Sequence, residues 1–385
     1  MSDPAPSFPA PPGAVPWADP RREAAFGSWL AGAADAHGLR LGTLRIASAD
    51  ASFRRYLRID SERGSRIVMD APPDKEDCHA FVKVAGLMAQ AGLNVPRVLA
   101  WDEAQGFMLL DDLGTQTMIE VVDRENPDAN RPLYMRAVDA LVAWQAASRP
   151  GVLPPYDEAL LARELALFPD WYLERHRGVK VEGTVRETLD STFRMIIGRN
   201  LASPAVYVHR DFMPRNLMMP GNVAPTLAAG AAALPPEGAV SPWGGPAAKP
   251  AETRLGVLDF QDAVYGPITY DIASLMRDAF LSWDEEFVLD ITVRYWQKAQ
   301  KAGLPVDGDF GEFYKSVEWM GLQRHLKVLG IFCRLKHRDA KPKYSTDLPR
   351  FFNYAHKVAA RYNALRPLSR LLEPLMGAER LEGFY

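Results

Sequence analysis

Two short apolar runs that each end at a carboxylate restrict the possible folds of this chain more than any other feature of its sequence. The first run, residues 206–208, leads into a His-Arg-Asp triplet at 209–211, and Asn216 follows after four intervening residues. The second run, residues 255–258, ends at Asp259. Apolar runs of this length are typical of buried strands, so both acids are predicted at strand ends that a hairpin can bring together.

The first motif has the spacing of a kinase catalytic loop, in which His-Arg-Asp is followed after four residues by Asn. We predict that Asp211, with Arg210 and His209 beside it, accepts the proton of an acceptor hydroxyl. Asp259 opens an Asp-Phe pair that fits the position of the Asp-Phe-Gly carboxylate. Asn216 and Asp259 are therefore predicted to hold Mg²⁺ on the phosphates of ATP.

The first third of the chain has the pattern of a small sheet-based lobe. A Pro-rich segment, residues 1–20, is predicted to be a mobile tail. Residues 21–112 are predicted to form the lobe on the nucleotide side, with five antiparallel strands and helices at 22–37 and 79–91. Each helix is expected to end at the glycine that follows its last apolar residues.

The remainder of the chain, residues 113–385, is predicted to be a mainly helical lobe that carries the catalytic loop and the acceptor site. It contains a segment at 220–253 that is dense in Ala, Gly and Pro and is predicted to be a flexible insertion. This insertion explains why the two motifs lie further apart than usual, since loop length costs little free energy. The predicted fold class is α+β, with the two lobes of a protein-kinase-like fold.

Composition excludes several other classes of protein. A formal net charge of −3 over 385 residues gives no general attraction to nucleic acid or to an anionic membrane. Cys78 and Cys333 are isolated from each other and belong to no spaced Cys/His ligand pattern, so neither a disulfide framework nor a cysteine-based zinc site is expected. The sequence shows no signal-peptide pattern and no apolar run of about 18 residues. We expect a cytoplasmic monomer that binds neither nucleic acid nor membrane.

At these motifs the chain resembles the aminoglycoside phosphotransferase and choline kinase family, over roughly residues 41–344. Within that family it is similar to the bacterial anomeric kinases for N-acetylmuramate and N-acetylglucosamine, which act in peptidoglycan recycling. The strings that carry this narrower resemblance are residues 50–56, 68–73, 109–114, 167–172 and 324–330. The resemblance implies an ATP- and Mg²⁺-dependent kinase that phosphorylates the 1-hydroxyl of these amino sugars.

The predicted phosphate site departs from the kinase pattern in two ways. The turn that should cover the phosphates has no Gly, so the hydroxyls of Ser48 and Ser52 would have to serve. The third strand, at 66–70, has no Lys to pair with the phosphates. We predict that Arg54 or Arg55 neutralises the phosphates instead, although both could also be solvated strand residues.

Two further features concern the nucleotide. The base is predicted to hydrogen-bond the backbone where the lobes join, at Leu110, Asp111, Asp112 and Leu113. The helix at 79–91 has Phe81 at the inward position where kinases carry a Glu. The usual Lys–Glu pair is therefore predicted to be absent.

The candidate acceptor contacts are Asp262, Trp171, Arg324, Lys327 and Arg334. N-acetylmuramate is an anion and should need a basic partner, and the three cations share roughly one face of a late helix. Such rows of charge are more often solvated faces, and an aromatic residue at helical spacing is more often part of the core than a platform for a sugar.

Several alternatives stay open. Asp271 begins an apolar helical segment, where it could be an N-cap or could support the catalytic loop. The acceptor could instead be an aminoglycoside, choline or homoserine, and the missing Lys and Gly residues allow a nucleotide-binding pseudokinase. A protein kinase is disfavoured, because the short separation of Asp259 from Asp271 leaves no room for an activation segment.

Overall fold

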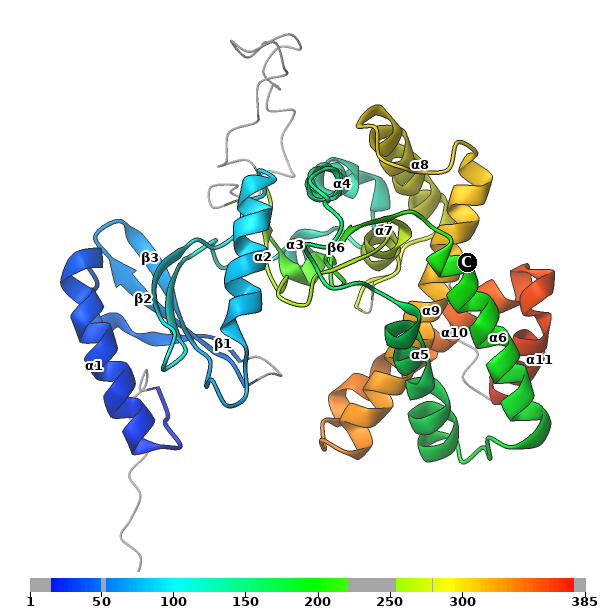
Figure 1. Cartoon of the computed structure of the whole chain (residues 1–385), viewed down its shortest axis with the longest axis horizontal. Helices are drawn as coiled ribbons and strands as arrows, with labels where there is room; N and C mark the ends of the chain where they lie inside the picture. The colour runs from blue at the N-terminus through cyan, green and yellow to red at the C-terminus, as the bar shows by residue number, and fades with distance from the viewer. Residues whose placement is uncertain (1–14, 50–52, 221–253, 279, 377–385) are drawn as a thin grey trace, which may run out of the picture.

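The computed structural model describes residues 15–49, 53–220, 254–278 and 280–376 (Figure 1). It consists of a small lobe built on a sheet and a larger lobe built from helices. The predicted α+β fold class with two lobes is thereby confirmed. The predicted insertion, apart from Pro220, and the candidate residue Ser52 lie outside the described residues.

The small lobe is a five-stranded antiparallel sheet with the strand order β1-β2-β3-β5-β4. One helix, α1, covers a face of the sheet, and α2 lies on the side of the helical lobe (Figure 1). The predicted strands and helices of this lobe are all present. Their bounds are α1 Pro20–His37, β1 Arg45–Ala49, β2 Arg55–Ser61, β3 Gly64–Asp70, α2 Cys78–Gln90, β4 Val98–Asp102 and β5 Phe107–Asp111.

Local sequence sets both ends of α1. The side chain of Asp19 caps the first turn by accepting a backbone hydrogen bond, and Gly38 ends the helix with a left-handed φ of 61°. Before the helix, the ring of Trp17 contacts Phe26, with 4.9 Å between ring centroids. Residues 15–19 of the predicted mobile tail are therefore anchored to the small lobe by an aromatic contact, and the tail prediction was too long at this end.

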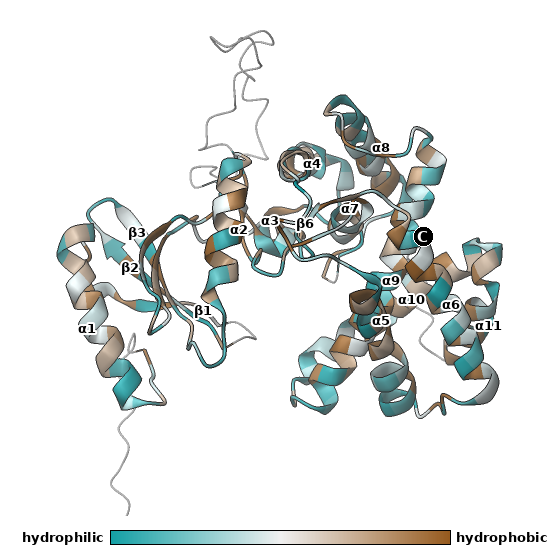
Figure 2. Ribbon diagram, in the orientation of Figure 1, coloured by the Kyte–Doolittle hydropathy of each residue, from teal (hydrophilic) through white to brown (hydrophobic). Residues whose placement is uncertain are grey.

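The two faces of the sheet contribute to different cores because side chains alternate along each strand. Leu57 and Val68 pack with Phe26 and Leu30 of α1 in a separate apolar cluster. Met69 points to the opposite face and belongs to the main core, which continues into the helical lobe. Figure 2 shows apolar residues in the strands of the small lobe that lie nearest to the helical lobe. The inner face of the sheet is thus part of the junction between the lobes.

In the described part of the chain, the larger lobe is helical apart from two short strand pairs, β6 with β9 and β7 with β8. No helix among the described residues is both long and apolar enough to cross a lipid bilayer. The elements are α3 Met118–Val121, α4 Arg131–Ala146, α5 Glu158–Leu167, a π-helix Phe168–His176, α6 Gly183–Leu201, β6 Ala205–Val208, β7 Leu217–Met218, β8 Gly256–Val257, β9 Val264–Pro267, α7 Thr269–Met276, α8 Glu285–Lys301, α9 Phe310–His337, α10 Leu348–Arg361 and α11 Arg366–Leu372.

The long helix α9 organises this lobe, since α5, α6, α7, α10 and the π-helix all pack against it. Gly330 lies where α9 meets the end of α5. A Cβ atom at this position would lie 2.3 Å from the carbonyl oxygen of Leu167, well inside any allowed contact. The glycine therefore sets the spacing between α9 and the junction of α5 with the π-helix.

Candidate active site

The catalytic loop lies between two strand pairs. β6 leads into the loop and pairs with β9, while β7 follows the loop and pairs with β8, just before Asp259. The pairing brings the predicted groups together: Asn216 Nδ2 lies 3.2 Å from Asp259 Oδ2 and 2.9 Å from the carbonyl oxygen of Asp211. Asp211 is half-buried and Asp259 is exposed, so both carboxylates can reach a ligand.

Asn216 and Asp259 have the chemistry of a magnesium site, because carboxylate and amide oxygens are the hard ligands that Mg²⁺ prefers. Within the described part of the chain, the Asn216 side chain makes its two hydrogen bonds through its nitrogen, which leaves the amide oxygen for a metal ion. Gln261 Nε2 donates to Asp259 Oδ1 at 2.9 Å and orients that carboxylate. The described residues contain no group of three or more His, Cys, Asp or Glu side chains that could hold a metal, so phosphate oxygens would have to complete the coordination.

His209 supports the loop from below and does not face a ligand. Its side chain is fully buried, with Nε2 lying 3.0 Å from the carbonyl oxygen of Leu258. Its Nδ1 accepts a hydrogen bond from the backbone amide of Asp211 at 3.2 Å. Burial lowers the pKa of His209, so the ring is neutral at pH 7. Its role is to tie the catalytic loop to the segment that carries Asp259.

Asp271 holds the backbone of the same loop. Its carboxylate accepts hydrogen bonds from the amides of His209, at 2.7 Å, and Arg210, at 3.0 Å. Burial raises the pKa of Asp271 to about 6, against the opposing effect of these hydrogen bonds. Because Ile268 occupies the N-cap of α7, the N-cap interpretation of Asp271 is wrong and the supporting role is correct.

Two residues of the site have left-handed backbone conformations, which non-glycine residues adopt rarely. Arg210 has a φ of 78° and Asp259 a φ of 63°. Backbone strain of this kind persists only where surrounding contacts hold it, and it concentrates at functional sites. The amide of Arg210 is held by Asp271, so the strained peptide directly before Asp211 is fixed by a buried carboxylate.

A buried acid that the sequence did not single out, Glu164 of α5, joins the loop to α9. Its carboxylate accepts hydrogen bonds from Arg210 Nη2 at 2.7 Å, Lys327 Nζ at 2.7 Å and Gln323 Nε2 at 2.9 Å, and also from the hydroxyl of Tyr156. Burial alone would raise the pKa of Glu164, but the charges of Lys327 and Arg210 outweigh it and lower the pKa to about 2. The carboxylate is therefore ionised at any physiological pH.

The structure places the predicted acceptor cations differently from one another. Lys327 is committed to Glu164, and Arg324 is buried beneath the loop, where Nη2 lies 3.4 Å from the carbonyl oxygen of Arg210. Arg334 comes ten residues after Arg324, roughly 15 Å further along α9. The row of cations is therefore not a single binding face, because burial and distance divide it.

The two other acceptor candidates also lie in different places. Asp262 is exposed and closely follows Asp259, so it remains beside the site. Trp171 lies in the π-helix, packs against the main core, and has the guanidinium of Arg175 at 5.9 Å from its ring. The structure thus shows Trp171 in a packing role.

The two candidate phosphate arginines point to opposite faces of the sheet. Arg55 is held by Asp70, which also binds Arg22 of α1, and its guanidinium lies 3.8 Å from the ring of Trp17. Arg55 therefore lies on the face of the sheet that α1 covers, so it cannot be the arginine that neutralises the phosphates. Arg54, on the opposite face, remains the candidate.

Arg54 is buried and forms an ion pair of 2.9 Å with Glu76. Glu76 lies just before α2, so a cation from the start of β2 pairs with an acid at the start of the facing helix. Glu76 precedes the first residue of α2, so the pattern of the helix itself does not reveal this acid. Phe81 is buried, as expected, and its ring contacts Phe260 at 4.9 Å between centroids. Ser48 lies in β1.

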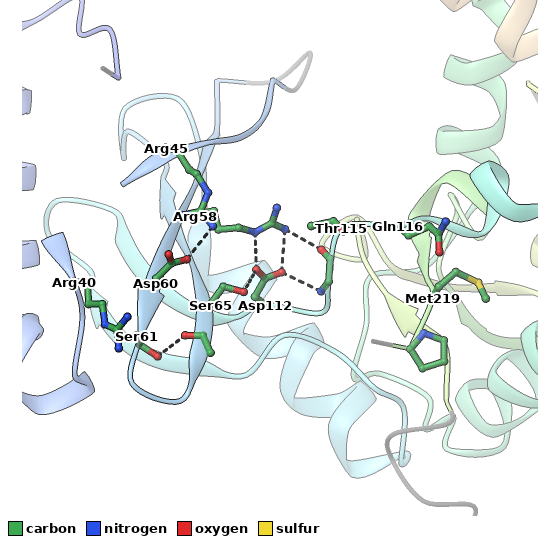
Figure 3. Close-up of a pocket in the computed structure, with 13 residues that line it drawn as sticks. Arg40, Arg45, Arg58, Asp60, Ser61, Ser65, Asp112, Thr115, Gln116 and Met219 are labelled. Carbon is green, nitrogen blue, oxygen red and sulfur yellow. Dashed lines mark hydrogen bonds and ion pairs between the residues drawn. The ribbon is translucent and has the colours of Figure 1, made fainter. Parts of the chain in front are cut away.

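A cavity of about 700 Å³ opens beside the segment that joins the lobes, between the β2–β3 end of the sheet and Met219 of the helical lobe (Figure 3). Arg58 Nε binds Asp112 Oδ2 at 2.6 Å, and Arg58 Nη2 donates to the carbonyl oxygen of Gly114 at 2.8 Å. Ser65 donates to the same carboxylate at 2.7 Å. These contacts lower the pKa of Asp112 despite its burial and fix the joining segment to the sheet.

Of the residues predicted to hold the base, Leu110 is buried on the inner face of β5. The side chains of Asp111 and Asp112 are engaged by Arg97 and Arg58. The backbone amide of Asp111 also donates to the carbonyl oxygen of Arg97. Binding of the base by the backbone of this segment stays a prediction. The sequence could have indicated the position of Arg58, because alternation along β2 places this residue on the face opposite Leu57 and Ile59.

Comparison with known proteins agrees with this geometry. The sequence profile of the family described as "Phosphotransferase enzyme family" matches residues 43–224 and 249–305. An N-acetylmuramate/N-acetylglucosamine kinase of Pseudomonas aeruginosa is 48% identical over 334 residues, which cover 86% of this chain and 89% of that protein. A kinase of the same name from Neisseria meningitidis serogroup B is 46% identical over 341 residues, covering 88% and 92%.

A solved structure shows the same fold at low sequence identity. ADP-bound aminoglycoside phosphotransferase APH(2'')-Ib superposes with a TM-score of 0.51 at 12% identity, covering 88% of this chain and 99% of that one. At this identity the likeness concerns the fold alone. Together with the profile match and the two close relatives, it leads to one conclusion: the chain belongs to the phosphotransferase enzyme family.

Proposed function

We propose that the protein is an ATP- and Mg²⁺-dependent kinase that phosphorylates the anomeric 1-hydroxyl of N-acetylmuramate and N-acetylglucosamine. The observation that carries this proposal is the position of Asn216, whose Nδ2 lies 2.9 Å from the backbone carbonyl oxygen of Asp211 and 3.2 Å from Asp259 Oδ2. A proton acceptor beside two oxygen ligands for a metal is the arrangement that phosphoryl transfer to a hydroxyl requires. The choice of sugar is supported by the names of relatives that are 48% and 46% identical.

In this mechanism each residue has a separate task. Asp211 accepts the proton of the sugar hydroxyl as its oxygen attacks the terminal phosphate of ATP. Asn216 and Asp259 would hold Mg²⁺, which supplies neutralisation of phosphate charge when bound. Arg54, fixed by Glu76, adds positive charge from the small lobe. The product is a sugar 1-phosphate.

The cations in and beneath the catalytic loop do not select the acceptor by charge, because Arg210 and Lys327 share the carboxylate of Glu164 and Arg324 is buried. Preference for an amino sugar over an aminoglycoside is supported by the names of the relatives. We also propose that the protein is a cytoplasmic monomer with a role in peptidoglycan recycling. A net charge of −3 supports the proposal that it binds neither nucleic acid nor membrane.

The test is an acceptor screen with the purified full-length protein. ADP formation from ATP and Mg²⁺ is measured with N-acetylmuramate, N-acetylglucosamine, kanamycin, choline and homoserine, and the product is identified by ³¹P NMR. We expect turnover with the two amino sugars and a phosphate on the anomeric carbon. Turnover with only kanamycin, choline or homoserine would reject the proposed acceptor, and nucleotide binding without any turnover would identify a pseudokinase.

A further inference from the structure

We infer that Arg215 binds the lactyl carboxylate of N-acetylmuramate and makes the enzyme favour this acidic sugar over N-acetylglucosamine. The inference rests on the proposed function and adds a specificity-determining residue to it. Arg215 lies in the short 3-10 turn Pro214–Asn216 of the catalytic loop. It comes four residues after Asp211 and directly before Asn216, so its backbone position is fixed with the reacting groups.

The side chain of Arg215 is held in place without losing its hydrogen-bonding capacity. It is exposed, and its guanidinium carbon lies 4.7 Å from the centroid of the Phe280 ring. A guanidinium that stacks on an aromatic ring uses its flat face, which leaves the N–H donors at its edge free to bind an anion. Among the residues that the structure describes, no carboxylate forms an ion pair with Arg215.

The other cations close to the loop are already engaged. Arg210 and Lys327 share the carboxylate of Glu164. Arg324 is buried, donates to the carbonyl oxygen of Arg210 and stacks on Tyr270 at 5.0 Å. An anionic substituent on the acceptor would therefore find its available donors on Arg215, within the part of the chain that is described.

The position of Phe280 keeps Arg215 in the lobe that carries the proposed base. Phe280 belongs to the segment between α7 and α8, in the helical lobe, and Asp211 lies in the same lobe. Arg54 and Glu76, the pair proposed for the phosphate side, come from the small lobe. Stacking on Phe280 thus holds the guanidinium in the lobe of Asp211, where the acceptor hydroxyl must lie.

The chemistry of the two sugars makes this position selective. N-acetylmuramate carries a lactyl carboxylate that N-acetylglucosamine lacks, and a guanidinium fork matches a carboxylate with two parallel hydrogen bonds. Loss of a charge-assisted hydrogen bond of this kind lowers kcat/KM by about tenfold to a hundredfold. The neutral sugar has no such bond to lose, so the ratio of the two activities is the property that Arg215 controls.

The experiment compares wild type, Arg215→Ala and Arg215→Lys with N-acetylmuramate, its methyl ester and N-acetylglucosamine. The ester keeps the lactyl group and removes its charge. We expect Arg215→Ala to lower the ratio of kcat/KM for the acid to that for N-acetylglucosamine at least tenfold, and to treat acid and ester alike. Arg215→Lys should recover part of the preference. Arg194→Ala, which removes an exposed cation on α6, is the matched control and should keep the wild-type ratio.

The outcomes separate the two proposals. If wild type phosphorylates both sugars and Arg215→Ala keeps the wild-type ratio, the assignment of Arg215 is overturned while the proposed function stands. An equal fall in kcat with both sugars would place Arg215 on the transferring phosphate and would also overturn the assignment. If wild type phosphorylates neither sugar, both proposals fall.

Discussion

Replacing Glu164 with Gln removes the one negative charge that Arg210 and Lys327 share, and the structure gives a magnitude for the cost. Glu164 has a pKa of about 2 in the folded protein against an ordinary value of 4.5, and its side chain is 6% exposed. This difference corresponds to roughly 3 kcal/mol of folding stability at pH 7. Breaking a buried ion pair by removing one partner costs about 3–5 kcal/mol in other proteins, which agrees in size.

The dependence on pH follows from the direction of the pKa change. Because folding lowers the pKa of Glu164, its contribution is fully present above about pH 4.5 and is lost as the pH falls towards 2. The glutamine variant lacks this contribution at every pH. The difference in stability between wild type and Glu164→Gln should therefore be largest near neutral pH and shrink below pH 4.5.

The assay is urea unfolding of both proteins at pH 7 and at pH 4 and below, followed by far-ultraviolet circular dichroism. We expect Glu164→Gln to lower the free energy of unfolding by about 3 kcal/mol at pH 7. It should also lower kcat with little change in the KM for ATP, because Arg210 loses the partner that fixes it beside Asp211. Adding Lys327→Met should restore part of the stability, since one uncompensated cation is removed with the acid.

The control is Glu187→Gln, which neutralises an exposed acid on α6. The reasoning is refuted if Glu164→Gln lowers the free energy of unfolding at pH 7 by less than about 1 kcal/mol, no more than the control does, and leaves kcat unchanged. It would mean that the buried carboxylate contributes no more than a surface charge.

Two further predictions concern the reaction itself. Asp211→Asn should lower kcat by roughly 10²–10⁴ while ATP still binds, as steady-state kinetics and nucleotide titration can show, and a wild-type rate would remove Asp211 as the base. Arg54→Ala should raise the KM for ATP, whereas Arg55→Ala should lower thermal stability and leave that KM unchanged, because Arg55 binds Asp70 on the opposite face. Equal KM values for both variants would reject Arg54 as a phosphate-side group.

Much of the small lobe could be predicted from sequence because its signals are local. Alternating side chains marked β2, a short apolar run marked β3, and Gly38 marked the end of α1. The meeting of Asn216 with Asp259 could also be predicted, since the spacing of the motif and the strand-like runs leave little freedom to the loop. In each case the information lies within a few residues of the feature.

The remaining parts depend on contacts between distant segments. Glu164 binds Arg210 and Lys327, which lie 46 and 163 residues away, and nothing in the pattern of α5 distinguishes a buried acid from a solvated one. Neighbours such as Arg54 and Arg55 point to opposite faces, so choosing between them requires knowing which face of the sheet α1 covers, and tertiary packing decides that. The π-helix after α5 was also missed, because a widened turn has no clear periodicity of its own.

Gly330 lies outside the catalytic loop, yet the packing of its helix makes it a position where substitution should be poorly tolerated. Even the single methyl group of alanine would press on the carbonyl of Leu167 and move α5 as a unit. Since α5 carries Glu164, that displacement would reach Arg210 and the strained peptide before Asp211. Efforts to stabilise this enzyme by filling glycine positions with alanine should therefore spare residue 330, where a gain in chain stiffness would come with a misaligned base.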